Sequence, residues 1–173
     1  MESDEELMAA VARGEERALG ALVERHAARL HAFLVRAAGT RDDADDLLQD
    51  TWIRVARGAP TFDPRRRARP WLYGIAANLA RDHHRRRSVR LRAAHEERNA
   101  PAPERAVFRP LERIDLRHRL DRLPDRLREV LMLRFYADLD EAEMAEALGI
   151  PKGTVKSRLH GAIRELRRGW EEP

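Results

Sequence analysis

Apolar residues recur every three or four positions over most of the chain, which is the spacing of one face of an α-helix. The pattern predicts helices over residues 4–13, 15–38, 42–57 and 70–92, and it returns from residue 111 to 166. Gly14, Gly39 and the segment 58–60 stand where helices are expected to end. Ser3 and Glu6 have the spacing of a capping box at the first helix. No segment alternates with a period of two, so we expect an all-α protein.

Residues 93–110 separate the two helical series. The apolar period is lost there, and Pro101, Pro103 and Pro110 fall within the segment, as in a semi-stiff linker. The expected architecture is therefore two helical modules, residues 1–92 and 111–173, joined by the linker 93–110. The 173 residues are enough for two small domains.

Residues 141–166 predict a helix-turn-helix in the second module. A short helix ends at Gly149, which adopts a left-handed conformation easily, and Pro151 is tolerated at the start of the next helix. The expected buried stripe of that second helix contains Val155, Leu159, Ile163 and Leu166.

The polar side of the same helix is rich in hydrogen-bond donors that suit phosphates and base edges in a DNA major groove. A plain helical hairpin with a solvated basic face is the alternative. Glycine on this side would let backbone and DNA approach closely. The candidate DNA-binding residues are Lys152, Thr154, Lys156, Ser157, Arg158, His160, Gly161 and Arg164.

The helix 42–57 has two contrasting sides. Its expected core stripe contains Ala44, Leu47, Leu48, Thr51 and Val55. The opposite side carries an apolar residue among acidic and amide groups, which is typical either of a protein interface or of an ordinary solvated face. These residues are Asp43, Asp46, Gln49, Asp50 and Ile53.

The helix after Pro70 and the loop before it combine aromatic, amide and arginine side chains. Bases stack on aromatic rings and arginines hold the backbone, so the combination suits single-stranded nucleic acid. A salt-bridged exposed helix with Trp71 in the core is the alternative. The candidate residues are Phe62, Arg65, Arg66, Trp71, Tyr73, Asn78, Arg81 and Arg85.

Composition narrows the choice of function only in part. Lys plus Arg total 34 against 30 for Asp plus Glu, a net charge of +4, and clustered arginines favour an anionic partner. Arginine-rich chains are also common where genomes favour GC codons, so charge alone does not decide. The absence of cysteine excludes disulfides and thiolate chemistry and fits a cytoplasmic protein.

Several other classes of site receive no support from the sequence. No apolar run approaches the roughly 20 residues that span a membrane, and the first residues do not form a signal peptide. His83 and His84 are adjacent and point in different directions on a helix. We therefore expect no membrane insertion, no metal, no other cofactor and no catalytic group.

Four ordered motifs resemble those of extracytoplasmic-function (ECF) sigma factors, the promoter-binding subunits of bacterial RNA polymerase. Residues 43–52 resemble region 2.2 of that family, and residues 70–82 resemble regions 2.3 and 2.4. Residues 123–131 and 148–160 resemble regions 4.1 and 4.2. The likeness covers nearly the whole chain.

The resemblance implies a role for each surface. Asp46, Gln49 and Asp50 would dock on the clamp helices of the polymerase's largest subunit, and the second module on its flap. Trp71, Asn78 and the loop 58–69 would capture unpaired bases of the promoter −10 element. The helix 151–168 would read the −35 element in duplex DNA, and an anti-sigma factor would be the inhibitor.

Two alternatives remain at this stage. A conventional helix-turn-helix regulator would explain residues 111–173 but not the acidic helix or the aromatic helix. A nuclease would need carboxylates that converge on metal. Asp42, Asp43, Asp45, Asp46 and Asp50 are clustered but partly diverge around their helix.

Overall fold

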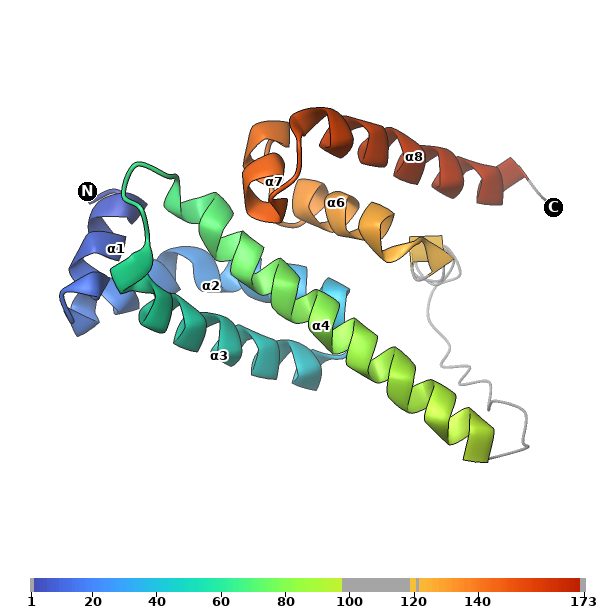
Figure 1. The fold of residues 1–173 in the computed structure, drawn as a ribbon, viewed down its shortest axis with the longest axis horizontal. Helices are drawn as coiled ribbons and strands as arrows, with labels where there is room; N and C mark the ends of the chain where they lie inside the picture. The colour runs from blue at the N-terminus through green and yellow to red at the C-terminus, as the bar shows by residue number, and fades with distance from the viewer. Residues whose placement is uncertain (1, 98–118, 121, 172–173) are drawn as a thin grey trace.

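Seven α-helices and one 3₁₀ turn make up the part of the chain that the computed structural model describes, residues 2–97, 119–120 and 122–171 (Figure 1). No strand occurs in those ranges, as expected. The elements are α1 (Asp4–Ala12), α2 (Glu16–Ala38), α3 (Arg41–Gly58), η1 (Ala59–Thr61), α4 (Ala68–Glu97), α6 (Asp125–Phe135), α7 (Glu141–Leu148) and α8 (Lys152–Glu171).

Local capping explains most helix ends. Ser3 forms the predicted capping box with Glu6, and Asp140 forms a second one with Glu143 at the start of α7. Gly39 and Gly149 end α2 and α7 with φ of 88° and 64°, the left-handed conformation that favours glycine.

The helix α4 is longer than the sequence pattern predicted. It begins at Ala68, two residues before Pro70, and it continues to Glu97. Residues 93–97 of the expected linker are therefore helical. The rest of that linker and the return of apolar periodicity at Leu111 lie outside the described residues.

The first module packs α1 to α4 around an aliphatic core. Leu22, Phe33 and Leu34 of α2 are buried together with Val55 of α3 and Leu72 of α4. The predicted stripe of α3 faces this core. No described helix combines the length and apolar character needed to cross a lipid bilayer.

The second module packs α6, α7 and α8 together. Val155 and Ala162 of α8 are fully buried, and Leu159 and Leu166 flank them. The expectation that Ile163 belongs to the buried stripe was wrong, because its side chain is 39% exposed. Ala162 takes the inward position instead, where it is buried with Leu123 and Leu131.

The two modules lie against each other along α4 (Figure 1). On one side α4 packs on α2 and α3, and on the other it packs on α7. Buried residues of both modules, including Met132, Leu133 and Met144 from the second, form one continuous hydrophobic cluster. Gly74 of α4 permits the closest approach, because a Cβ at this position would lie 2.6 Å from the backbone oxygen of Ala147 in α7.

Candidate nucleic-acid interface

The solvent side of α8 presents a row of donors. Ser157, His160 and Arg164 are all exposed and follow one another at intervals of three and four residues, so they share one face of the helix. The turn at Gly149 and the cap at Asp140 fix α7 and α8 in the predicted helix-turn-helix arrangement. This face therefore has the shape and chemistry that fit a DNA groove.

The remaining candidates on α8 have other neighbours as well. Lys152 and Lys156 lie 3.8 and 3.7 Å from a carboxylate oxygen of Glu141 in α7. Thr154 and Gly161 line a groove of about 500 Å³ beside α6, together with Ser157 and Arg164 of the donor row.

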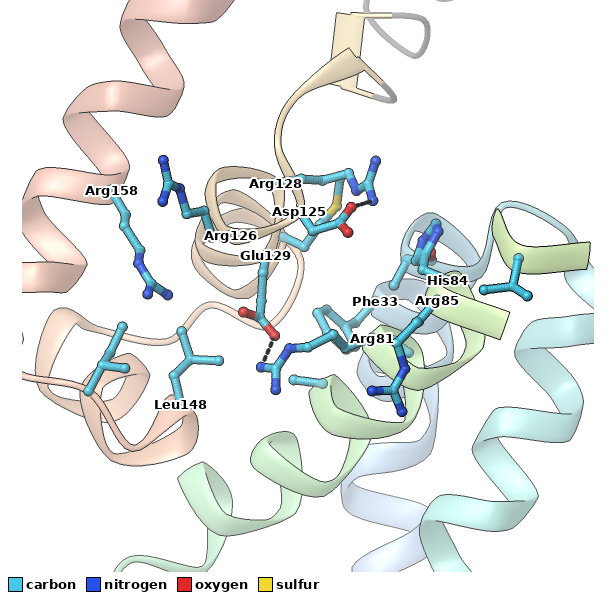
Figure 2. A pocket seen from close by; sticks show the side chains of 16 residues that line it. Phe33, Arg81, His84, Arg85, Asp125, Arg126, Arg128, Glu129, Leu148 and Arg158 are labelled. Carbon is cyan, nitrogen blue, oxygen red and sulfur yellow. Dashed lines mark hydrogen bonds and ion pairs between the residues drawn. The ribbon is translucent and has the colours of Figure 1, made fainter. Parts of the chain in front are cut away.

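Gly161 lies four residues after Ser157 and three before Arg164, so it shares the face of the donor row. A Cβ at this position would meet Leu127 of α6 at 3.5 Å, an ordinary contact, so this face borders α6 at the glycine. Arg158 turns toward a cavity between the modules (Figure 2).

A second candidate surface runs along α4. Trp71, Asn78 and Arg85 recur every seven residues and so lie on one line of the helix. The ring of Trp71 is half-buried and contacts Phe62, with 5.2 Å between the ring centroids. Gly58 at the end of α3 makes room for the indole, because a Cβ there would lie 3.0 Å from it. The line thus offers an aromatic pair, an amide and a guanidinium.

Tyr73 does not belong to this surface, which corrects the expectation that it stacks on bases. Its side chain is fully buried and meets Phe33 of α2 edge to face, with 6.0 Å between the ring centroids. The helix α4 is covered from two sides, so a position that an isolated helix would expose lies in the core. Burial raises the pKa of the Tyr73 hydroxyl, which lacks a hydrogen-bond partner among the described residues.

The arginines of the loop before α4 are held by carboxylates. Arg65 donates to Asp63 within the loop, and this hydrogen bond lowers the pKa of Asp63. Arg66 and Arg67 instead reach across to Glu146 of α7, at 3.3 and 3.4 Å.

Arg67 of the loop and Arg69 in the first turn of α4 make further contacts with the second module. Arg67 and Arg69 lie 3.8 and 3.6 Å from Glu143. Arg69 also donates to the backbone oxygens of Ala137 and Asp138 at 2.6 and 2.9 Å. The ion pairs of Arg67 and Arg69 with α7 were not foreseen, because their partners lie more than 70 residues away and leave no local pattern.

A cavity of about 640 Å³ separates α4 from α6 and α8 (Figure 2). Arg81 donates to both Asn78 of its own helix and Glu129 of α6. Burial raises the pKa of Glu129, while the charge of Arg81 opposes that rise.

His84 lies at the rim of this cavity. It bonds the backbone oxygen of Ala37 at the end of α2. Burial and the nearby Arg128 lower its pKa, so the neutral imidazole is favoured in the folded protein.

The acidic side of α3 faces solvent. Asp46, Gln49 and Asp50 are exposed, and Ile53 is 47% exposed beside them. Asp43 is half-buried; its carboxylate accepts from Thr40 at the helix start and lies 3.5 Å from His83 of α4. The structure therefore brings the predicted set together on one open face.

Metal chemistry finds no site in the described residues, where no three His, Asp or Glu side chains converge as metal ligands would. The clustered aspartates of α3 point around the helix, and His83 and His84 have rings that diverge at 77°.

Comparison with protein families assigns both modules. Residues 22–90 match Sigma-70 region 2, and residues 113–166 match Sigma-70 region 4. The two matches fall on the helices that carry the α3 and α4 surfaces and on the helix-turn-helix. The class of protein is thus that of the sigma-70 factors.

Individual relatives narrow the class. The chain is 35% identical over 172 residues to the RNA polymerase sigma factor NccH of Alcaligenes xylosoxydans xylosoxydans, covering 94% of this chain and 92% of that one. It is 34% identical to the ECF RNA polymerase sigma factor SigL of Mycobacterium tuberculosis, over 93% of each chain.

A solved structure of CnrH in complex with the cytosolic domain of CnrY matches with a TM-score of 0.74 and 30% identity, over 96% of each chain. The chain belongs to the ECF sigma factors of RNA polymerase.

Proposed function

We propose that this protein directs RNA polymerase core to a set of promoters and assists their melting, with each surface binding one partner. The observation that carries the proposal is the pairing, in one chain, of an exposed donor row on a helix-turn-helix with an aromatic, amide and arginine line on α4. The row of Ser157, His160 and Arg164 reads the −35 element as duplex. The exposed side of α3 docks on the clamp helices of the polymerase's largest subunit, and the second module docks on its flap.

The mechanism is differential binding without covalent chemistry. Phe62 and Trp71 offer a stacking platform, Asn78 offers an amide, and Arg85 offers a charge to unpaired −10 bases. These groups bind open DNA more tightly than closed duplex, so they shift the melting equilibrium. Unstacking costs on the order of a few kcal/mol, and stacking returns about 1–3 kcal/mol for each base. A few captured bases are enough to favour the open strand.

Regulation by a separate protein fits the same chain. The structure of the relative CnrH is a complex with the cytosolic domain of CnrY. By this likeness we infer an anti-sigma factor that binds the present protein in the cytoplasm, where the polymerase and the chromosome lie. The protein itself acts as an initiation factor and not as an enzyme.

A run-off transcription assay with bacterial core polymerase and a library of promoter fragments tests the proposal. Discrete start sites should appear only when the protein is added. The variant Asp46→Ala/Asp50→Ala should lose core binding and transcripts together, while Glu16→Ala/Glu24→Ala, which removes two exposed charges from α2, should retain both. Duplex binding without core, with no core binding and no transcripts, would instead assign a conventional regulator.

A further inference from the structure

The surface proposed for the −10 element is partly occupied by the protein's own second module. Four arginines of the first module, Arg66, Arg67, Arg69 and Arg81, meet carboxylates of α6 and α7. We call these contacts the arginine clamp, and its acidic members are Glu129, Glu143 and Glu146, with Asp140 at 4.0 Å from Arg67.

The acidic members of the clamp are well shielded from water. The side chains of Glu129, Glu143 and Glu146 are 14%, 12% and 21% exposed, respectively. A shielded carboxylate needs a charged or hydrogen-bonding partner, because desolvation otherwise disfavours its ionised form. The arginines supply that partner, so the pairs depend on the closed arrangement and differ from ordinary surface ion pairs.

Backbone geometry at the turn between α6 and α7 adds to the clamp. Asp138 has a φ of 53°, a left-handed conformation that Asp tolerates better than most residues. The turn directs the oxygens of Ala137 and Asp138 to the guanidinium of Arg69. Arg69 therefore donates to two backbone oxygens of the second module and also forms an ion pair with Glu143.

A glycine controls whether the modules can close. A Cβ at Gly74 would meet the backbone of Ala147 at 2.6 Å, and backbone cannot rotate away as a side chain can. Any other residue at this position would hold α7 away from α4. Gly74 is in the interior of a helix, where glycine is less favourable than alanine by about 1 kcal/mol. The close approach of α7 therefore explains why glycine occupies position 74, although glycine is unfavourable inside a helix.

We propose that the second module acts as an internal competitor of single-stranded DNA, with Glu129, Glu143 and Glu146 standing in for DNA phosphates on the arginines of the first module. This inference rests on the proposed function and adds its regulation. Carboxylate and phosphate oxygens bind guanidinium with the same geometry, so both cannot occupy Arg66 or Arg81 at once. Because the second module is linked to the first, it competes for the arginines at an effective concentration in the millimolar range. A weakly binding DNA strand at a lower concentration therefore cannot displace it.

The inference predicts a quantitative gain when the clamp is broken. Apparent affinity falls in proportion to the fraction of molecules that are open. If about one molecule in ten is open, full release raises the affinity for single-stranded DNA about tenfold. The variant Glu143→Gln/Glu146→Gln removes two of the three competing charges and leaves Glu129 in place, and glutamine at position 143 preserves the capping box. Its matched control is Glu16→Gln/Glu24→Gln, which changes the net charge equally on the exposed side of α2.

The second variant is Gly74→Ala, which opens the modules by steric contact without a change of charge. Its matched control is Gly20→Ala, also inside a helix, where a Cβ would meet nothing within 4 Å. Both substitutions favour their helices, so a difference between them reports the contact with α7.

Two readouts on the full-length protein test the inference. The chain has no cysteine, so Ala28→Cys and Arg167→Cys, both exposed, accept a fluorescent donor and acceptor. Energy transfer between them should be lower in Gly74→Ala and Glu143→Gln/Glu146→Gln than in the parent and the controls. Anisotropy of a labelled mixed-sequence single-stranded oligonucleotide should show about tenfold tighter binding by the same two variants.

The possible outcomes separate the two proposals. Unchanged energy transfer and unchanged affinity in both variants would overturn the clamp, while core-dependent transcription would still stand. Open modules with no gain in affinity would also overturn it, because the arginines would then not be competed for. Failure of the run-off assay alone would remove the promoter function and leave the intramolecular competition measurable.

Discussion

The two DNA surfaces of the protein differ in what covers them. The donor row of α8 faces solvent, whereas the arginines beside the α4 surface are paired with the second module. Duplex DNA therefore binds the α8 donor row without any rearrangement. Single-stranded DNA binds the α4 surface only after the second module has moved away from the arginines. Duplex binding and strand binding can therefore start from different conformations of the protein, the first with the modules in contact and the second with them apart. The exposed side of α3 belongs with the first kind of surface.

The largest effect is expected from the core that joins the two surfaces. Leu133 is fully buried in the cluster that both modules share. Leu133→Ala should lower the free energy of unfolding by about 2–5 kcal/mol, because the cavity it leaves is costly. Chemical denaturation measures the change. Phe135→Ala on the same helix is the control, since that side chain is 70% exposed and should alter stability by less than about 0.5 kcal/mol.

A smaller and more selective effect is expected at the open surface. Arg164→Ala should weaken binding to the mapped −35 duplex by about tenfold, because one good contact to a base or phosphate contributes about 1–3 kcal/mol. It should leave energy transfer between the modules unchanged. Titration of labelled duplex at several salt concentrations measures the loss. Equal weakening by Arg17→Ala, which removes an exposed charge from α2, would show that charge and not position matters.

At the α4 surface, substitutions of Tyr73 and Trp71 should affect the affinity for single-stranded DNA differently. Tyr73→Phe removes a buried hydroxyl without a partner among the described residues, so stability should stay equal or rise by up to about 1 kcal/mol. Its affinity for single-stranded DNA should be unchanged. Trp71→Ala should lose about 1–3 kcal/mol of stacking on the same oligonucleotide. A loss of strand affinity in Tyr73→Phe would restore the tyrosine to the binding surface.

The smallest effect is expected from pH at the rim of the cavity. Burial and Arg128 lower the pKa of His84 in the folded protein, so folding favours its neutral form. Its contribution to stability is therefore complete above the unfolded pKa of about 6.5 and is lost as pH falls through the lower folded value. The Tm should decrease by less than about 4 °C as a result. His84→Gln should lessen the decrease in thermal scans between pH 7.5 and 5.5 (about one unit on each side of the unfolded pKa), and an identical profile would reject this assignment.

Local chemistry explains why much of the fold was predictable. Ser3, Gly39, Gly149 and Pro151 act within one or two helical turns, so the sequence displays their effects directly. The open faces of α3 and α8 were predictable for a similar reason, because each helix is buried on one side only.

The errors have one common cause, which is packing between segments far apart in the chain. Tyr73 lies on a helix that is covered twice, and helical periodicity assumes a single buried side. Ile163 was misplaced because the side of α8 that is buried depends on how the helix packs on α6, and Ala162 is the residue buried there. The arginine clamp joins residues between 48 and 80 positions apart, and nothing in the local sequence marks such a pair.

The packing of Trp71 connects polymerase binding at α3 with binding of the DNA strand at α4. Its indole rests against Gly58, the final residue of α3, and its other neighbour is Phe62 just beyond η1. The aromatic pair thus packs against the end of α3, the same helix whose exposed side carries Asp46 and Asp50. A partner that binds α3 therefore also restricts the motion of this aromatic pair. A DNA strand that then stacks on the pair loses less conformational entropy on binding, because the pair is already ordered.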